Sequence, residues 1–109
     1  MKLVNLTPHD INIADETGKF FRTIPPTGVP ARVQTIALPR GDIDGVPFVE
    51  TSYGEVENLP PEDEETVYIV SQFVINALPN RKDLVRPDTG PSCVRDGDGN
   101  IIGVRSLTR

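Results

Sequence analysis

The sequence has few of the residues that most often carry metal or redox chemistry. It holds one cysteine, Cys93, and one histidine, His9, among 109 residues. An intramolecular disulfide, a cysteine zinc site and a histidine metal cluster each need at least two such residues, so their number excludes all three. A lone thiol is typical of a reducing compartment, and we expect a cytoplasmic protein with no metal site and no cofactor.

Long apolar runs are also missing. Residues 1–10, MKLVNLTPHD, contain no apolar segment of the kind found in secretory leaders. No stretch of the chain reaches the roughly 20 apolar residues that a membrane-spanning helix requires. We therefore expect neither a leader peptide nor contact with a membrane.

Positive charge is scarce as well. The formal net charge is −5, which disfavours sequence-independent binding to duplex nucleic acid. Residues 1–79 carry 5 Lys or Arg against 12 Asp or Glu, whereas residues 80–109 carry 6 against 4. Arginine binds a carboxylate or phosphate in a more defined geometry than lysine does, because its planar guanidinium donates two parallel hydrogen bonds. The C-terminal third therefore suggests a site for a small anionic ligand, with solvated surface arginine as the alternative for any single residue.

Residues 66–86, TVYIVSQFVINALPNRKDLVR, form the strongest local pattern. Residues 66–70 are β-branched and aromatic, which predicts a central strand. Ser71 is a candidate N-cap for a helix that Pro79 ends. Four apolar residues share one face of that helix at helical spacing, namely Phe73, Val74, Ala77 and Leu78. A polar, basic turn follows the helix.

Short strands are predicted through the other parts of the chain. They fall at residues 2–6, 11–14, 19–24, 31–38 and 46–54, and on both sides of the turn Gly97-Asp98-Gly99. Residues 40–45 are predicted as a turn, and the acidic residues 55–65 as a loop. Strand spacing of this kind is typical of small barrels and sandwiches. We expect a single domain, residues 1–109, of the α+β class: a compact, β-rich barrel or sandwich-like domain with one principal helix.

His9 is the first candidate for chemistry. It stands beside Asp10, and a His–Asp pair suggests a general base. Adjacent residues on a strand point to opposite faces, however, and no Ser, Cys or Thr nucleophile stands at a recognisable spacing from His9. A turn-capping or polar-contact role is therefore favoured, and no catalytic residue is predicted.

The strand-to-helix junction is the second candidate. The free N–H groups of a helix N-terminus, with the Ser71 hydroxyl, can hold a phosphate. Arg81 and Arg86 follow the helix, while Arg95 and Arg105 stand on the two arms of the last hairpin. Two like charges placed together there favour an anion between them, although a neighbouring carboxylate can neutralise either arginine.

Nearly the whole chain resembles one family. The segments VNLTPHDINI, IPPTGVPARV, GVPFVETSYGEVENLP, VYIVSQFV, RKDLVRP and VRDGDGNIIGVRSL look like those of small, mostly uncharacterised proteins of tailed phages, prophages and actinobacteria, in the same order. Members often have Cys where this chain has Val104, so the resemblance implies no necessary thiol there. If the chain comes from a phage, one class of phage protein becomes a candidate. These are the oligomeric sponge proteins, which bind and sequester the nucleotide signals of host immunity, such as the Thoeris anti-defence proteins.

The residues and the resemblance together suggest a non-enzymatic phage protein. It would be a homo-oligomer that captures a phosphorylated, cyclic nucleotide immune signal in the cytoplasm of the bacterial host. The expected ligand-binding residues are Thr7, His9, Ser71, Asn80, Arg81, Arg95 and Arg105. The first two would contact the base or ribose, and the other five the phosphate. One alternative is a phage structural or host-protein interaction module that uses residues 55–65. The other is a small hydrolase that uses His9 and Asp10.

Overall fold

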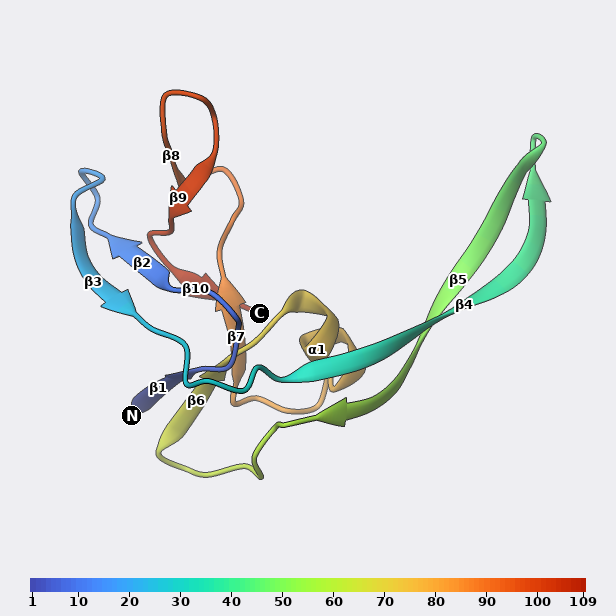
Figure 1. The fold of residues 1–109 in the computed structure, drawn as a ribbon, viewed down its shortest axis with the longest axis horizontal. Coiled ribbons are helices and arrows are strands. Elements are labelled where there is room, and N and C mark those ends of the chain that lie inside the picture. The colour runs from blue at the N-terminus through green and yellow to red at the C-terminus, as the bar shows by residue number, and fades with distance from the viewer.

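The computed structural model describes all of residues 1–109 and shows a body of short strands with one helix and a long arm (Figure 1). Its elements are β1 Lys2–Asn5, β2 Ile11–Ala14, β3 Phe20–Ile24, β4 Arg32–Ile43, β5 Val46–Glu57, β6 Thr66–Ile69, α1 Gln72–Ala77, β7 Leu84–Pro87, β8 Val94–Arg95, β9 Ile101–Gly103 and β10 Leu107–Thr108. The predicted β-rich α+β class is confirmed. The sheets are open, with four strands or two, so no barrel closes.

The central sheet has the strand order β1-β6-β7-β10. Strands β1, β6 and β7 run parallel, with Val4 opposite Tyr68 and Tyr68 opposite Leu84, and β10 lies antiparallel to β7. The predicted central strand is confirmed, because β6 has a neighbour on each side. A parallel strand covered on both faces is apolar along its whole length, which explains the unbroken Val67-Tyr68-Ile69-Val70 run.

The predicted helix is present but short. Ser71 is extended and its hydroxyl accepts a hydrogen bond from the Val74 N–H at 3.4 Å, as expected of an N-cap. The helix has 6 residues and turns Val74 into the core, whereas Phe73 is 56% exposed, so the prediction that Phe73 lies on the same apolar face as Val74 is wrong. Successive helix positions differ by about 100°, and burial of Val74 and partly of Leu78 turns Phe73 outward. No helix in the structure is long and apolar enough to cross a membrane.

Strands β7 and β10 were not predicted. Residues 84–87 contain an arginine and a proline, and the sequence pattern assigned them to a basic loop. In the structure the Val70 N–H donates to the Val85 carbonyl at 2.8 Å, and Leu107 pairs with Pro87. A short polar segment becomes a strand here because a neighbouring strand satisfies its backbone groups.

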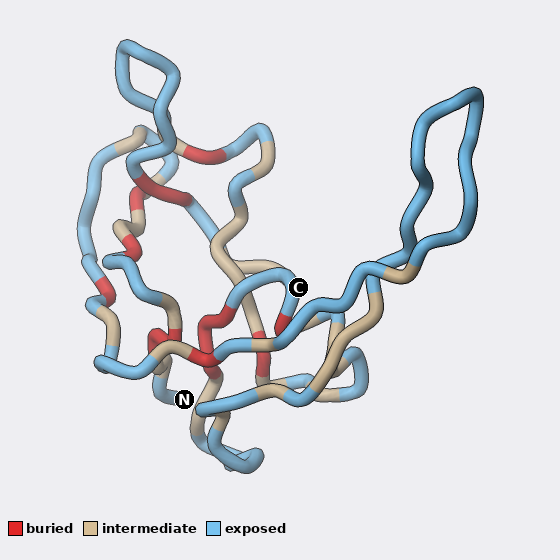
Figure 2. Tube along the Cα trace, turned by 45° about the vertical axis from the view of Figure 1, so that its right-hand side comes forward, coloured by how far each residue is buried: buried red, intermediate tan, exposed pale blue.

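The core lies entirely in the body, as the buried stretches in Figure 2 show. One cluster contains Leu6, Ala31, Tyr68, Val70, Val74 and Leu84. The other contains Ile11, Ile24, Ile69, Cys93 and Val104. Adjacent residues of β6 contribute to different clusters, so this strand separates the two halves of the core.

The arm consists of β4 and β5, which have 12 residues each. Its turn is Asp44-Gly45, with φ of 50° and 78°, as in a type I′ hairpin. The predicted turn over residues 40–45 is therefore too wide, and residues 55–57 belong to β5 instead of a loop. The arm raises the radius of gyration to 16.4 Å, compared with about 13 Å for a compact chain of this length.

Candidate functional site

A buried asparagine organises the loop after β1. The Asn5 side chain donates to the carbonyls of His9 and Ile24 at 2.8 and 2.9 Å. Its Oδ1 accepts from the Thr7 N–H at 2.9 Å and from the Thr7 hydroxyl at 2.7 Å. Asn5 is fully buried, and these four bonds satisfy its polar atoms. The side chain thereby fixes the backbone that carries Thr7 and His9.

A cleft of about 570 Å³ lies beside this loop. Three of its walls lie at the ends of the parallel strands. The first is formed by Thr7 and residues 9–12 after β1, the second by residues 70–72 after β6, and the third by Arg86, Pro87 and Thr89 at the end of β7. Residues 101–104 of the last hairpin form the fourth wall. The carboxyl ends of parallel strands meet at one sheet edge, which is where ligands bind in open α/β sheets. The volume is within the roughly 300–1,000 Å³ of small-molecule sites.

Arg86 is the cation of the cleft. Its Nε is buried and has no hydrogen-bond partner. None of the three ion pairs in the chain involves this arginine. A buried donor without a partner costs about 1–3 kcal/mol, and more when it is charged. An anion bound to the guanidinium in the cleft would compensate the charge, whereas Nε itself is shielded from solvent.

Three of the seven predicted ligand residues, Thr7, His9 and Ser71, line the cleft together. The Thr7 hydroxyl is already bonded to Asn5. The Ser71 hydroxyl accepts from Val74 and keeps its own proton for another partner. Because α1 has only 6 residues, its macrodipole adds little, and the Ser71 hydroxyl is the useful part of the predicted phosphate site.

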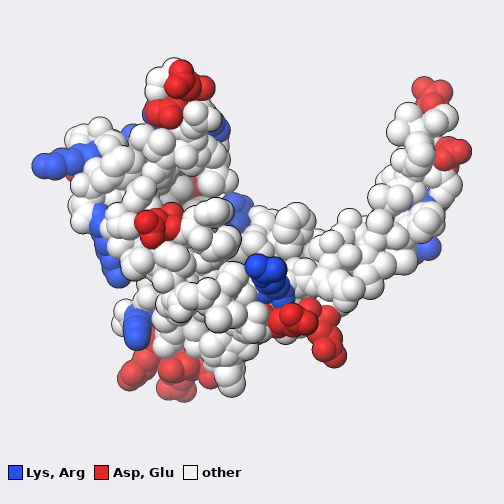
Figure 3. All heavy atoms as spheres, viewed as in Figure 1, with Lys and Arg blue, Asp and Glu red and all other residues white.

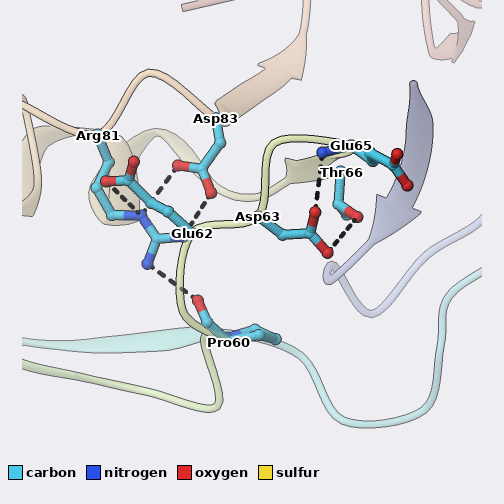
Figure 4. Close-up of polar contacts among 7 residues, drawn as sticks. All are labelled: Pro60, Glu62, Asp63, Glu65, Thr66, Arg81 and Asp83. Atoms are coloured by element: carbon cyan, nitrogen blue, oxygen red, sulfur yellow. Dashed lines mark hydrogen bonds and ion pairs between the residues drawn. The ribbon is translucent and has the colours of Figure 1, made fainter.

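Arg81 and the exposed Asn80 lie outside the cleft. The guanidinium of Arg81 is already bonded to other groups of the protein (Figure 4). Its Nε and Nη2 bond the two carboxylate oxygens of Asp83 at 2.9 and 2.5 Å, and Nη1 donates to the Pro60 carbonyl at 3.1 Å. Within the same loop, Asp63 accepts hydrogen bonds from the Glu65 N–H and the Thr66 hydroxyl. Arg81 thus ties the acidic loop to the body.

Hydrogen bonding to Arg81 lowers the pKa of Asp83 below its ordinary value. A lowered folded-state pKa means that the pair stabilises the fold fully above the unfolded-state value of about 4 and stops doing so as the pH falls through the folded-state pKa. We expect Asp83→Asn to cost about 2 kcal/mol of unfolding free energy at pH 7. Urea unfolding should show that this loss of unfolding free energy becomes smaller below pH 4. Asp98→Asn, the control, should leave the unfolding free energy unchanged at each pH. A cost that is independent of pH would contradict this account.

Arg95 and Arg105 also lie outside the cleft. Arg95 donates to the Gly99 carbonyl at 2.7 Å, within its own hairpin. Arg105 donates to the carbonyls of Asp15 and Ser92. Both arginines therefore hold turns, and they have no carbonyl partner in common. Their expected convergence on one anion is not what the structure shows.

Two aspartates build matching turns near these arginines. The Thr17 hydroxyl, followed by the Lys19 N–H, lowers the pKa of Asp15. The Asn100 N–H is the main cause of a lowered pKa at Asp96. The second turn closes the β8–β9 hairpin, and it thereby holds the β9 wall of the cleft in place.

Comparison with protein-family models, curated proteins and solved structures finds no match to this chain.

Arg86 was named with Arg81 as a basic residue after the helix, but it was not among the seven expected ligand-binding residues, although it is the cation of the cleft. A useful signal was present, because residues 84–87 follow a strand and a helix at the distance of a parallel crossover. With residues 84–87 recognised as a strand parallel to β6, Arg86 would have been placed at the same sheet edge as Ser71. The neutral polar cleft residues Asn12, Gln72 and Thr89 carry no comparable signal.

Proposed function

We propose that this protein binds a small phosphorylated ligand in the cleft without transforming it. The observation that carries the proposal is the position of Arg86, a partly buried guanidinium at the carboxyl edge of three parallel strands with no counter-ion in the chain. A guanidinium presents parallel N–H donors that fit two phosphate oxygens. The Ser71 hydroxyl supplies a further donor on an adjacent strand end.

The other cleft residues favour a ligand with more than a phosphate. Asp10 lines the cleft, and its carboxylate would repel a bare dianion but would accept hydrogen bonds from sugar hydroxyls or a base amino group. Ile101 and Ile102 are 45% and 39% exposed and offer an apolar surface to a base. A nucleotide-like ligand satisfies both features. A cyclic nucleotide signal of host immunity is the narrower form of this proposal.

Binding is favoured over hydrolysis by the surroundings of His9. Its N–H and carbonyl hydrogen-bond to Thr7 and Asn5, and no hydrogen bond joins its ring to Asp10 or to a hydroxyl. A nucleophile activated by a base requires such a contact, with a third group to orient the base. The Thr7 hydroxyl is bonded to Asn5 instead. A bound nucleotide should therefore be recovered intact after the protein is denatured.

Arg86→Gln should weaken ligand binding at least tenfold, because an amide cannot replace a charged bidentate fork. Titration calorimetry against inorganic phosphate, mononucleotides, cyclic nucleotides and ADP-ribose derivatives measures this effect.

Arg22→Gln is the matched control, since Arg22 is exposed on β3 and lies outside the cleft, and it should bind as the unaltered protein does. No binding across the panel would refute the proposal. Equal losses in both variants would refute the assignment to this cleft.

A further inference from the structure

The β4–β5 arm has no partner in the chain beyond its base. The two strands pair only with each other, and none of their residues is buried. At the base, Asn76 of α1 donates to the Tyr53 hydroxyl at 3.4 Å. An isolated two-stranded hairpin is at best marginally stable in water, yet this one leaves large apolar side chains in solvent. The most exposed of them are Ile36, Ile43, Val46, Phe48 and Val49.

The two outer edges of the arm differ because of Pro39. Pro39 is paired with Val49 but has no N–H, so this pair is of the non-hydrogen-bonded kind, in which backbone polar groups turn outward. The β4 edge therefore lacks a donor at its centre. The proline of β5, Pro47, stands beside the tip of the arm instead. The N–H groups of Val49 and Thr51 point to the free β5 edge, and no proline interrupts residues 48–57. An unblocked edge of this kind is a template for another strand.

The charges of the arm fit a second copy of the same chain. Its middle section contains one close pair, Arg40 and Glu50, whose atoms lie 3.5 Å apart and cancel in charge. Asp42 and Asp44 stand beside and within the turn at the tip, and Figure 3 shows acidic atoms at the end of the arm. Two arms that run antiparallel place their acidic tips at opposite ends, so the middle sections meet without repulsion.

We propose that the β5 edge pairs antiparallel with the β5 edge of a second copy and joins two arms into one four-stranded sheet. A two-fold axis makes an edge complementary to itself, because each outward N–H meets an outward carbonyl of the other copy. Only β5 forms the contact, and its 12 residues are fewer than the roughly 20–30 that each partner gives to a standard interface, so the dimer should dissociate on dilution. This surface is separate from the cleft and does not depend on the ligand.

The test compares two proline substitutions at directly opposed positions. Thr51→Pro removes an outward N–H from the β5 edge, and Ala37→Pro removes its counterpart from the β4 edge. Neither N–H takes part in the β4–β5 ladder. Native mass spectrometry and sedimentation should show a dimer for the unaltered chain and for Ala37→Pro. Thr51→Pro should raise the dimer dissociation constant at least tenfold.

Amide hydrogen exchange of the unaltered chain gives a measurement that requires no variant. The amides of Val49 and Thr51 should exchange more slowly as the protein concentration rises, while those of Thr35 and Ala37 should not change. A monomer at every concentration would overturn the proposal and leave the arm to a different partner. Equal dissociation of the two proline variants, or protection of both edges, would overturn the assignment to β5.

Discussion

Replacing Asn5 with alanine is expected to lower the free energy of unfolding by about 4 kcal/mol, because a cavity is created and buried groups lose their partners. The four side-chain hydrogen bonds of Asn5 join β1, the loop at Thr7 and His9, and the end of β3. Without this side chain, the carbonyls of His9 and Ile24 lose their donor from Asn5. Urea denaturation followed by circular dichroism at pH 7 measures the change.

Asn80→Ala is the matched control for this prediction. Asn80 is exposed and its side chain makes no hydrogen bond, so its replacement should change the unfolding free energy by less than about 0.5 kcal/mol. Similar stabilities of the two variants would show that Asn5 does not hold the loop. Because Asn5 fixes the backbone of Thr7 and His9, its loss should also weaken ligand binding in the cleft.

Gly103→Ala is the second substitution with a large expected effect. It should lower the free energy of unfolding by about 3 kcal/mol, which is the upper end of the usual cost of overpacking. A Cβ at Gly103 would overlap the Phe20 ring and lie 2.9 Å from the Asn12 carbonyl oxygen. That carbonyl accepts a hydrogen bond from the Val104 N–H at 2.9 Å. The Phe20 ring can rotate away, but the Asn12 carbonyl can move away only if β2 separates from β9, which forms a wall of the cleft.

Gly97→Ala is the control for this substitution within the same hairpin. A Cβ at Gly97 meets no atom within 4 Å, and its φ is not positive, so its unfolding free energy should change little. Thermal denaturation of both variants distinguishes a local clash from a general intolerance of the hairpin. A Gly103→Ala protein as stable as Gly97→Ala would show that the two elements separate at no cost.

Local patterns in the sequence were sufficient where neighbours in the chain decide the structure. The β-branched run of β6 and the N-cap at Ser71 were predicted correctly, and so was the hairpin around Gly97-Asp98-Gly99. Each depends on side chains or backbone angles within a few residues. The type I′ turn at Asp44-Gly45 is equally local, but the prediction of a turn over residues 40–45 was too wide.

Arg81 shows why the site was only partly predictable. Because Arg81 follows a helix in the sequence, it was expected to bind a phosphate. In the structure its guanidinium is bonded instead to the carboxylate of Asp83 and to the Pro60 carbonyl of a loop distant in the sequence. Arg95 and Arg105 likewise bond turn carbonyls. Which arginine keeps an unpaired guanidinium depends on all its spatial neighbours, and Arg86 is the one arginine that lines the cleft, with a buried Nε that has no partner.

The sequence by itself therefore determined the β-rich class, the central strand and its cap, and the shortage of metal-binding and redox residues. The tertiary structure alone decided that β1, β6 and β7 lie parallel and bring Thr7, Ser71 and Arg86 to one edge. It also decided that β4 and β5 leave the body as an arm. Strand order and register arise from pairings between distant residues, and such pairings leave no periodic mark on the chain.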